Sequence, residues 1–170
     1  MISKFIKGKV YVFIDAANIL YSQQSLRWKV DYEKLKKYFE KECDLGEIYF
    51  YTGHVGENHK QGKFLDKLKS FGYHVVAKEV KRIKISRNTY EWKGNLDAEL
   101  IIDALKNIDN FETCILMSGD SDFAPLLDEL KEKRKRVIVM STKNHISREL
   151  LERAKYVNIR KLKDWIEFRK

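Results

Sequence analysis

Two aspartates lie close together in residues 118–122, Ser-Gly-Asp-Ser-Asp, directly after the short apolar run 115–117. Apolar residues then recur from Phe123 with the spacing of one helix face, and Pro125 falls in the first turn of that segment. This pattern predicts a strand, a glycine turn and a helix, with Asp120 and Asp122 in the turn. One aspartate there could simply cap the helix. Two leave one carboxylate available for a metal ion or for catalysis.

Two further aspartates stand at comparable boundaries. Asp15 ends the continuous apolar run 10–14, which is typical of a strand buried on both faces of a parallel sheet. Asp97 begins a predicted helix over residues 97–107, where it could act as a cap. At 100° per residue Asp97 falls on the apolar face of that helix and Glu99 nearly opposite, toward water. A lone buried carboxylate is costly, and a metal ion is one of the few ways to make it tolerable.

The elements that must position these side chains alternate along the chain. Apolar runs are found at residues 10–14, 48–51, 73–77, 115–117 and 137–140. Helices are predicted at about 32–41, 58–70, 97–107, from 123, and 147–154, with Asp31 capping the first and a turn at Asp44 and Gly46. The alternation predicts an α/β domain with a largely parallel sheet.

In a parallel sheet all strands end at one edge, and ligands bind there where the strand order reverses. Asp15, Asp97 and Asp120 should therefore converge if the first and fourth strands are neighbours. Several carboxylates in one cleft repel each other and need cations to stay ionised together. Clusters of oxygen ligands suit Mg²⁺ or Mn²⁺.

Residues 78–92 form a basic stretch without a helical stripe, which predicts an extended arm or an irregular hairpin. Its charges are Lys81, Arg82, Lys84 and Arg87, with Tyr90 and Trp92 after them. One interpretation is a solvated edge strand whose lysines discourage pairing. The other is a surface for a sugar-phosphate backbone, close to the cleft because the arm leads into Lys93 and Asp97.

Composition predicts a single globular domain over residues 1–170. The chain is 44% hydrophobic and 35% charged, with a formal net charge of +9 that makes an anionic partner plausible. No apolar run approaches the roughly 20 residues of a membrane span, and the first residues lack the apolar region of a signal peptide. Cys43 and Cys114 are predicted to be buried free thiols, which fits a reducing cytoplasm.

Other catalytic classes lack their motifs. The four histidines show no metal-ligand spacing, and no Gly-x-Ser-x-Gly elbow is present. No P-loop or Gly-x-Gly-x-x-Gly occurs, so no nucleotide cofactor is expected.

Three blocks of the sequence resemble the NYN domain family of the PIN-like nuclease superfamily. They are residues 13–18 (Phe-Ile-Asp-Ala-Ala-Asn), 93–97 (Lys-Gly-Asn-Leu-Asp) and 117–127, which contains Ser-Gly-Asp-Ser-Asp-Phe. The resemblance extends from about residue 10 to 162, with Leu96 where the family often has valine. It implies a three-layer Rossmann-like sheet of order 3-2-1-4-5 and divalent-metal-dependent cleavage of RNA.

The resemblance also implies roles for single residues. Asp15, Asp97 and Asp120 would be the metal carboxylates, with Asp122 a fourth acid and Asn18 orienting Asp15 or the substrate. The candidate substrate-binding residues are Asn18, Ser118, Lys81, Arg82, Lys84, Arg87 and Lys93.

The sequence thus predicts a ribonuclease that uses Mg²⁺ or Mn²⁺ on single-stranded or structured RNA, and it is compatible with an oligomer. The alternative is a catalytically inactive RNA-binding or scaffold module on the same fold. Metal-dependent chemistry on a small phosphorylated substrate is a third interpretation. It is disfavoured because that class usually has an acidic pair at the first strand, where this chain has Asp15-Ala16-Ala17.

Overall fold

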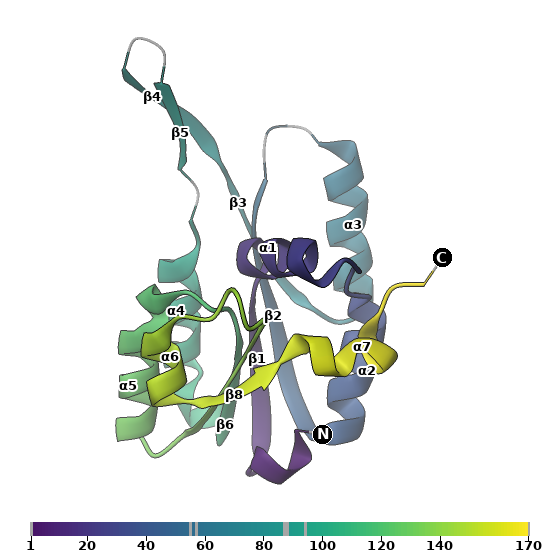
Figure 1. Ribbon diagram of the computed structural model, residues 1–170, viewed down its shortest axis with the longest axis vertical. Coiled ribbons are helices and arrows are strands. Elements are labelled where there is room, and N and C mark those ends of the chain that lie inside the picture. Colours follow the sequence, from purple (N-terminus) through teal and green to yellow (C-terminus); the bar gives the residue numbers. More distant parts are fainter. Residues whose placement is uncertain (1, 55, 57, 87–88, 94, 170) are drawn as a thin grey trace.

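The computed structural model describes residues 2–54, 56, 58–86, 89–93 and 95–169, and for residues 81–85 and 89–93 it describes the backbone. Its centre is a six-stranded parallel sheet of order β3-β2-β1-β6-β7-β8 (Figure 1). The strands are β1 Lys9–Asp15, β2 Asp44–His54, β3 His74–Glu79, β6 Thr113–Met117, β7 Arg136–Ser141 and β8 Lys155–Asn158. The predicted fold class and the order 3-2-1-4-5 are confirmed, and β8 adds a sixth strand at one edge.

Helices cover both faces of this sheet (Figure 1), because alternate side chains of each strand point to opposite sides. From β1, Val12 and Ile14 pack into one apolar cluster, and Tyr11 and Phe13 into the other. The first cluster is covered by α1 Ala16–Leu26, α2 Tyr32–Glu42, α3 His59–Ser70 and α7 Lys163–Ile166. The second is covered by α4 Asp97–Lys106, α5 Ala124–Glu132 and α6 Arg148–Arg153. Among the described residues, no helix is long and apolar enough to cross a membrane.

Short 3-10 turns connect several elements: η1 Ser3–Phe5, η2 Ile108–Asn110, η3 Ser121–Phe123 and η4 Ile159–Leu162. The predicted cap at Asp31 is confirmed, since its carboxylate accepts a hydrogen bond from the backbone N–H of Lys34 at 3.1 Å. Pro125 lies in the first turn of α5, as predicted.

The basic stretch forms a two-stranded antiparallel hairpin, β4 Lys81–Ser86 and β5 Thr89–Lys93. Figure 1 shows this hairpin extending away from the sheet beyond the end of β3. Of the two predicted conformations, extended arm and hairpin, the chain adopts the hairpin.

Two local predictions are wrong. Asp44 and Gly46 lie within β2, not in a turn, and the register with β1 shifts at this point so that Gly46 forms a bulge. A Cβ on Gly46 would overlap the Tyr11 ring, so the glycine permits a close contact. Cys114 is buried as predicted, but Cys43 is only partly buried.

Candidate metal centre

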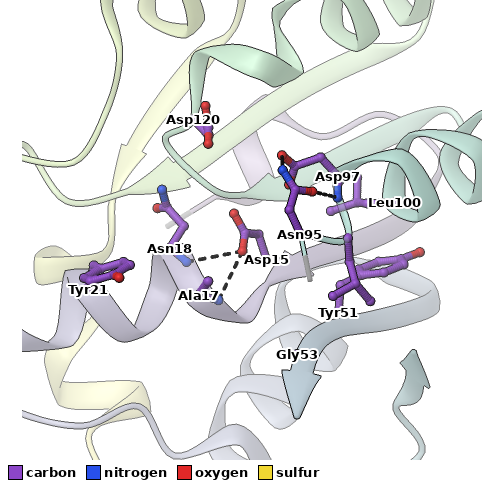
Figure 2. Close-up of a pocket in the computed structure, with 11 residues that line it drawn as sticks. Asp15, Ala17, Asn18, Tyr21, Tyr51, Gly53, Asn95, Asp97, Leu100 and Asp120 are labelled. Atoms are coloured by element: carbon purple, nitrogen blue, oxygen red, sulfur yellow. Dashed lines mark hydrogen bonds between the residues drawn. The ribbon is translucent and has the colours of Figure 1, made fainter. Parts of the chain in front are cut away.

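Carboxylates from three separate elements meet at the edge of the sheet where the parallel strands end. Asp15 is the last residue of β1, Asp97 the first of α4, and Asp120 and Asp122 follow β6. β1 and β6 are neighbours, with Ile14 paired to Met117. Asp15, Asp97 and Asp120 line one cleft of about 200 Å³, and Figure 2 shows their side chains directed into it.

The tightest carboxylate group within the described residues is Asp97, Asp120 and Asp122. One oxygen from each of them lies within 4.8 Å of the other two. Asp97 and Asp120 are partly buried, and Asp122 is exposed. The predicted metal ligands were Asp15, Asp97 and Asp120, so the structure places Asp122 in this group and Asp15 beside it.

Asp15 lies beside the group, and the surrounding chain also binds both of its oxygens. Oδ1 caps α1 by accepting hydrogen bonds from the N–H groups of Ala17 at 3.1 Å and Asn18 at 3.2 Å (Figure 2). Oδ2 accepts a hydrogen bond from the Ser118 hydroxyl at 2.9 Å. Burial raises the pKa of Asp15 and the charge of Asp120 raises it further, against the opposing effect of these hydrogen bonds.

Asp97 begins α4 without capping it, since Leu96 holds the cap position and no side-chain cap bond is formed. Its carboxylate instead accepts a hydrogen bond from Nδ2 of Asn95 at 2.5 Å, and its N–H donates to Oδ1 of the same side chain at 2.6 Å (Figure 2). Burial raises the pKa of Asp97, and the charges of Asp15, Asp120 and Asp122 add to this rise. The four acids therefore repel one another across the cleft.

Ser118 and Gly119 form hydrogen bonds that hold Asp15 and the loop carrying Asp120. Ser118 is fully buried, and its hydroxyl donates to Asp15 and accepts from the N–H of Asp120 at 3.2 Å. Its hydroxyl thus donates and accepts inside the protein, and the predicted contact of Ser118 with substrate stays a prediction. Gly119 donates its N–H to Oδ1 of Asn18 at 3.0 Å, so the Asn18 side chain orients the loop that carries Asp120.

The family model of the NYN domain matches residues 9–160. The chain belongs to the NYN domain family.

One similar protein supports this assignment, and a second has the same fold. The low amplitude and bright protein LabA of Synechococcus elongatus is 32% identical over 168 residues, which cover 96% of this chain and 90% of LabA. The crystal structure of VPA0982 from Vibrio parahaemolyticus, a protein of unknown function, has a TM-score of 0.78 at 24% identity. That match covers 95% of this chain and 97% of the other, and it shows a common fold. NYN domains have a PIN-like nuclease fold and are generally nucleases that act on RNA.

The basic candidates of this NYN domain lie on the hairpin. Lys81, Arg82 and Lys84 are in β4 and Lys93 is in β5, for which the backbone is described, and Arg87 lies outside the described residues. The hairpin leads into Asn95 and Asp97 at the cleft. The predicted binding of substrate by these basic residues stays a prediction.

Sequence reasoning did not identify several residues at this cleft. Asn95 holds Asp97, and Tyr21, 59% exposed, lines the cleft one helical turn after Asn18. Tyr21 could have been predicted from its position three residues after Asn18, because residues three apart lie on the same face of a helix. Glu99 was expected to point to water, but one of its oxygens pairs with Lys78 at 2.6 Å. Its Oε2 is buried with no hydrogen-bond partner among the described residues.

Proposed function

We propose that this NYN domain is a divalent-metal-dependent ribonuclease. The observation that carries the proposal is the group of three carboxylates within 4.8 Å, contributed by α4 and the loop after β6, beside the Asp15 carboxylate at the end of β1. Here hydrogen bonds from Asn95, Ser118 and the backbone hold them together against their repulsion.

The donor set fits Mg²⁺ or Mn²⁺, because every side chain in the group offers carboxylate oxygen, which hard cations prefer. Asp97, Asp120 and Asp122 would hold the ion. When bound, such an ion supplies positive charge to a phosphate oxygen and lowers the pKa of a water molecule.

The protein itself contributes position. Asp120 uses Oδ1 to cap η3 through the N–H of Asp122, at 3.0 Å, which holds these two acids in a constant relation. Asn95 orients Asp97 through two hydrogen bonds. Asp15 keeps the end of β1, the start of α1 and Ser118 together, so its role is to position the loop that carries Asp120.

The hairpin is proposed to bind the RNA backbone and offset the negative charge of the cleft. Neutralising Lys81, Arg82, Lys84 and Arg87 together should weaken binding of RNA at low salt. The slope of log affinity against log salt should fall by about 0.7 for each phosphate that the variant no longer neutralises. Fluorescence anisotropy across a salt titration measures this slope. An unchanged slope would leave the hairpin as an ordinary protected edge.

The test of the nuclease proposal is incubation with labelled single-stranded RNA, structured RNA and DNA, in Mg²⁺, in Mn²⁺ and in EDTA. We expect RNA to be cleaved with metal and to remain intact in EDTA. Asp120→Asn should abolish cleavage. The matched control is Asp109→Asn, the same chemical change at a residue of η2, before β6 and away from the cleft.

Cleavage that survives Asp120→Asn would contradict the assigned site. RNA binding by pure protein that cleaves none of these polymers in Mn²⁺ would instead support the inactive binding module.

A further inference from the structure

The cleft lined by Asp15, Asp97 and Asp120 is called the acid cleft below. A second, larger hollow lies along the edge strand β8. Its volume is about 780 Å³, within the range of roughly 300–1,000 Å³ found for ligand pockets. It is lined by η1, the loop after β7, the exposed side of α6, β8, η4 and α7. Figure 1 shows β8, the edge strand of the sheet, with α6 on one side of it and α7 on the other. We call this hollow the β8 groove.

Positive charge dominates the β8 groove. Four lysines line it, Lys4, Lys143, Lys155 and Lys161, and no acidic residue does. None of the four forms an ion pair with a carboxylate among the described residues. Six lysines elsewhere each lie within 4.0 Å of a carboxylate oxygen: Lys36, Lys37, Lys69, Lys78, Lys133 and Lys163. Lysines scattered over the helices, such as Lys41, Lys106 and Lys131, form no ion pair among the described residues either, so what distinguishes the groove is that four lysines gather in it. The groove thus brings four cationic side chains together with no acidic residue among its lining residues.

Aromatic side chains are interspersed with these lysines. Trp165 is 45% exposed, and Tyr156 and Phe5 also line the groove. The ammonium groups of Lys155 and Lys4 lie 4.4 and 5.1 Å from the centroid of the Phe5 ring. A groove that combines several cations with partly exposed rings is typical of proteins that bind single-stranded nucleic acid. The cations follow the phosphates and the rings stack on unpaired bases.

The edge of β8 adds backbone groups to this surface. β8 pairs with β7 on one side, and no described strand pairs with its other side. A second copy of the chain could in principle extend the sheet here. Self-association would bring four unpaired lysines against four others, so the charge favours a polyanion.

The β8 groove is separated from the acid cleft by one loop, residues 142–147. Lys143 and Ile146 of this loop line the groove. The same loop packs on Gly119, next to Asp120: the N–H of Ser147 donates to the Gly119 carbonyl at 2.9 Å. A strand bound in the groove therefore lies one loop away from the carboxylates.

We infer that the β8 groove binds single-stranded RNA beside the cleavage site, as a subsite separate from the hairpin. The choice of RNA as the polyanion rests on the proposed function. The groove itself rests on its lysines, its rings and its unpaired edge. It gives the enzyme a preference for substrates with an unpaired segment next to the cleaved bond, because stacking on Trp165 requires an unstacked base.

The test measures binding of fluorescein-labelled oligouridylate in EDTA, with Asp120→Asn present in every protein so that the RNA stays intact. Lys143→Gln, Lys155→Gln and Lys161→Gln are combined. The matched control combines Lys41→Gln, Lys106→Gln and Lys131→Gln, exposed lysines of α2, α4 and α5 that line neither surface. The groove variant should lower the salt slope by about two units, from about 0.7 for each phosphate neutralised. The control should leave it nearly unchanged.

A second arm tests stacking. Trp165→Ala should weaken binding of oligouridylate about tenfold, within the range for loss of one stacked base. Phe168→Ala, which removes a 49% exposed ring outside the groove, should have little effect. Duplex RNA of the same length should compete poorly with the single strand.

Three outcomes would overturn the inference. The groove and control variants could bind alike. Duplex RNA could compete as well as the single strand. Sedimentation could show a dimer that the groove substitutions dissociate, which would make the groove an interface between copies.

The same experiments distinguish failure of this inference from failure of the proposed function. If RNA is cleaved and Asp120→Asn abolishes cleavage, but the groove variants bind normally, the inference fails and the proposed function stands. If no RNA is cleaved but the groove variants bind RNA more weakly than the control, the proposed nuclease function fails and the RNA-binding groove stands.

Discussion

The acid cleft and the β8 groove lie on two sides of one loop and differ in how their charged side chains are held. In the cleft, Asp15 has both oxygens in hydrogen bonds and Asp97 is held by Asn95. In the groove, four lysines have no carboxylate partner among the described residues. Chemistry requires charges at fixed positions, whereas binding a flexible polyanion requires charges that can follow it. The difference separates the residues expected to control turnover from those expected to control affinity.

The largest expected effect is on cleavage, from a substitution in the carboxylate group of the acid cleft. Asp97→Asn keeps the size of the side chain but removes a charge from the tightest carboxylate group. Loss of a metal ligand is worth several kcal/mol, so cleavage should fall about a thousandfold. Affinity for RNA in EDTA should stay close to that of the unaltered protein. A comparable loss of both quantities would show that the two surfaces are not functionally separate.

Disrupting the loop between the two surfaces should have the next largest effect. A Cβ on Gly119 would overlap the backbone carbonyl of His145, so Gly119→Ala must displace the loop of residues 142–147. We expect a decrease of about 3 kcal/mol in the free energy of unfolding, together with reduced cleavage and reduced RNA affinity.

The control for that substitution is Gly62→Ala in α3, where a Cβ would meet nothing within 4 Å. There the change should stabilise the protein by about 0.5–1 kcal/mol. Chemical denaturation of the two variants compares them directly. Equal stability of both would contradict the close packing on Gly119.

A smaller effect is expected for Ser118→Ala. The substitution removes the hydroxyl that joins Asp15 to the N–H of Asp120. Cleavage should fall about tenfold, equivalent to about 1.4 kcal/mol, because Asp15 and the Asp120 loop no longer share a partner. Ser121→Ala, at an exposed neighbouring serine, is the control and should cleave normally. If binding of RNA fell and turnover did not, Ser118 would contact substrate after all.

The smallest expected effect is on the free energy of unfolding of the metal-free protein and on its pH dependence. Burial and neighbouring charges, including that of Asp120, raise the pKa values of Asp15 and Asp97. These two carboxyl groups thus bind protons more readily in the folded protein than in the unfolded chain, and their contribution to stability in EDTA should rise as pH falls through the raised pKa values. This contribution is complete below the ordinary aspartate pKa of about 4.

Asp120→Asn removes one source of this repulsion. It should stabilise the metal-free protein by about 1 kcal/mol near pH 7 and by less near pH 5. Thermal unfolding in EDTA at both pH values measures the difference. A variant less stable than the parent at both would indicate that hydrogen bonds of Asp120 outweigh the repulsion.

Much of the fold could be predicted from the sequence because its signals are local. The continuous apolar runs ending at Asp15 and before Ser118 predicted buried parallel strands, and the aspartates after them predicted an acidic edge. The turn at Asp44 and Gly46 was wrong, since a glycine bulge within a strand and a glycine turn have the same local composition. β8 was missed because an edge strand of four residues carries too few apolar positions to be distinguished from a loop.

The sequence by itself determined which acids and which five of the six sheet strands are present, through apolar runs and motifs that need no distant partner. The order of those five strands was implied by the resemblance to the NYN family. Only the tertiary structure decided how those groups are used. It placed Asp122 with Asp97 and Asp120, turned Ser118 inward to Asp15, and brought residues 2–5, 143–146 and 155–165 together around β8. The physical reason is that the direction of a side chain and the neighbours of a charge depend on packing between segments far apart in the chain.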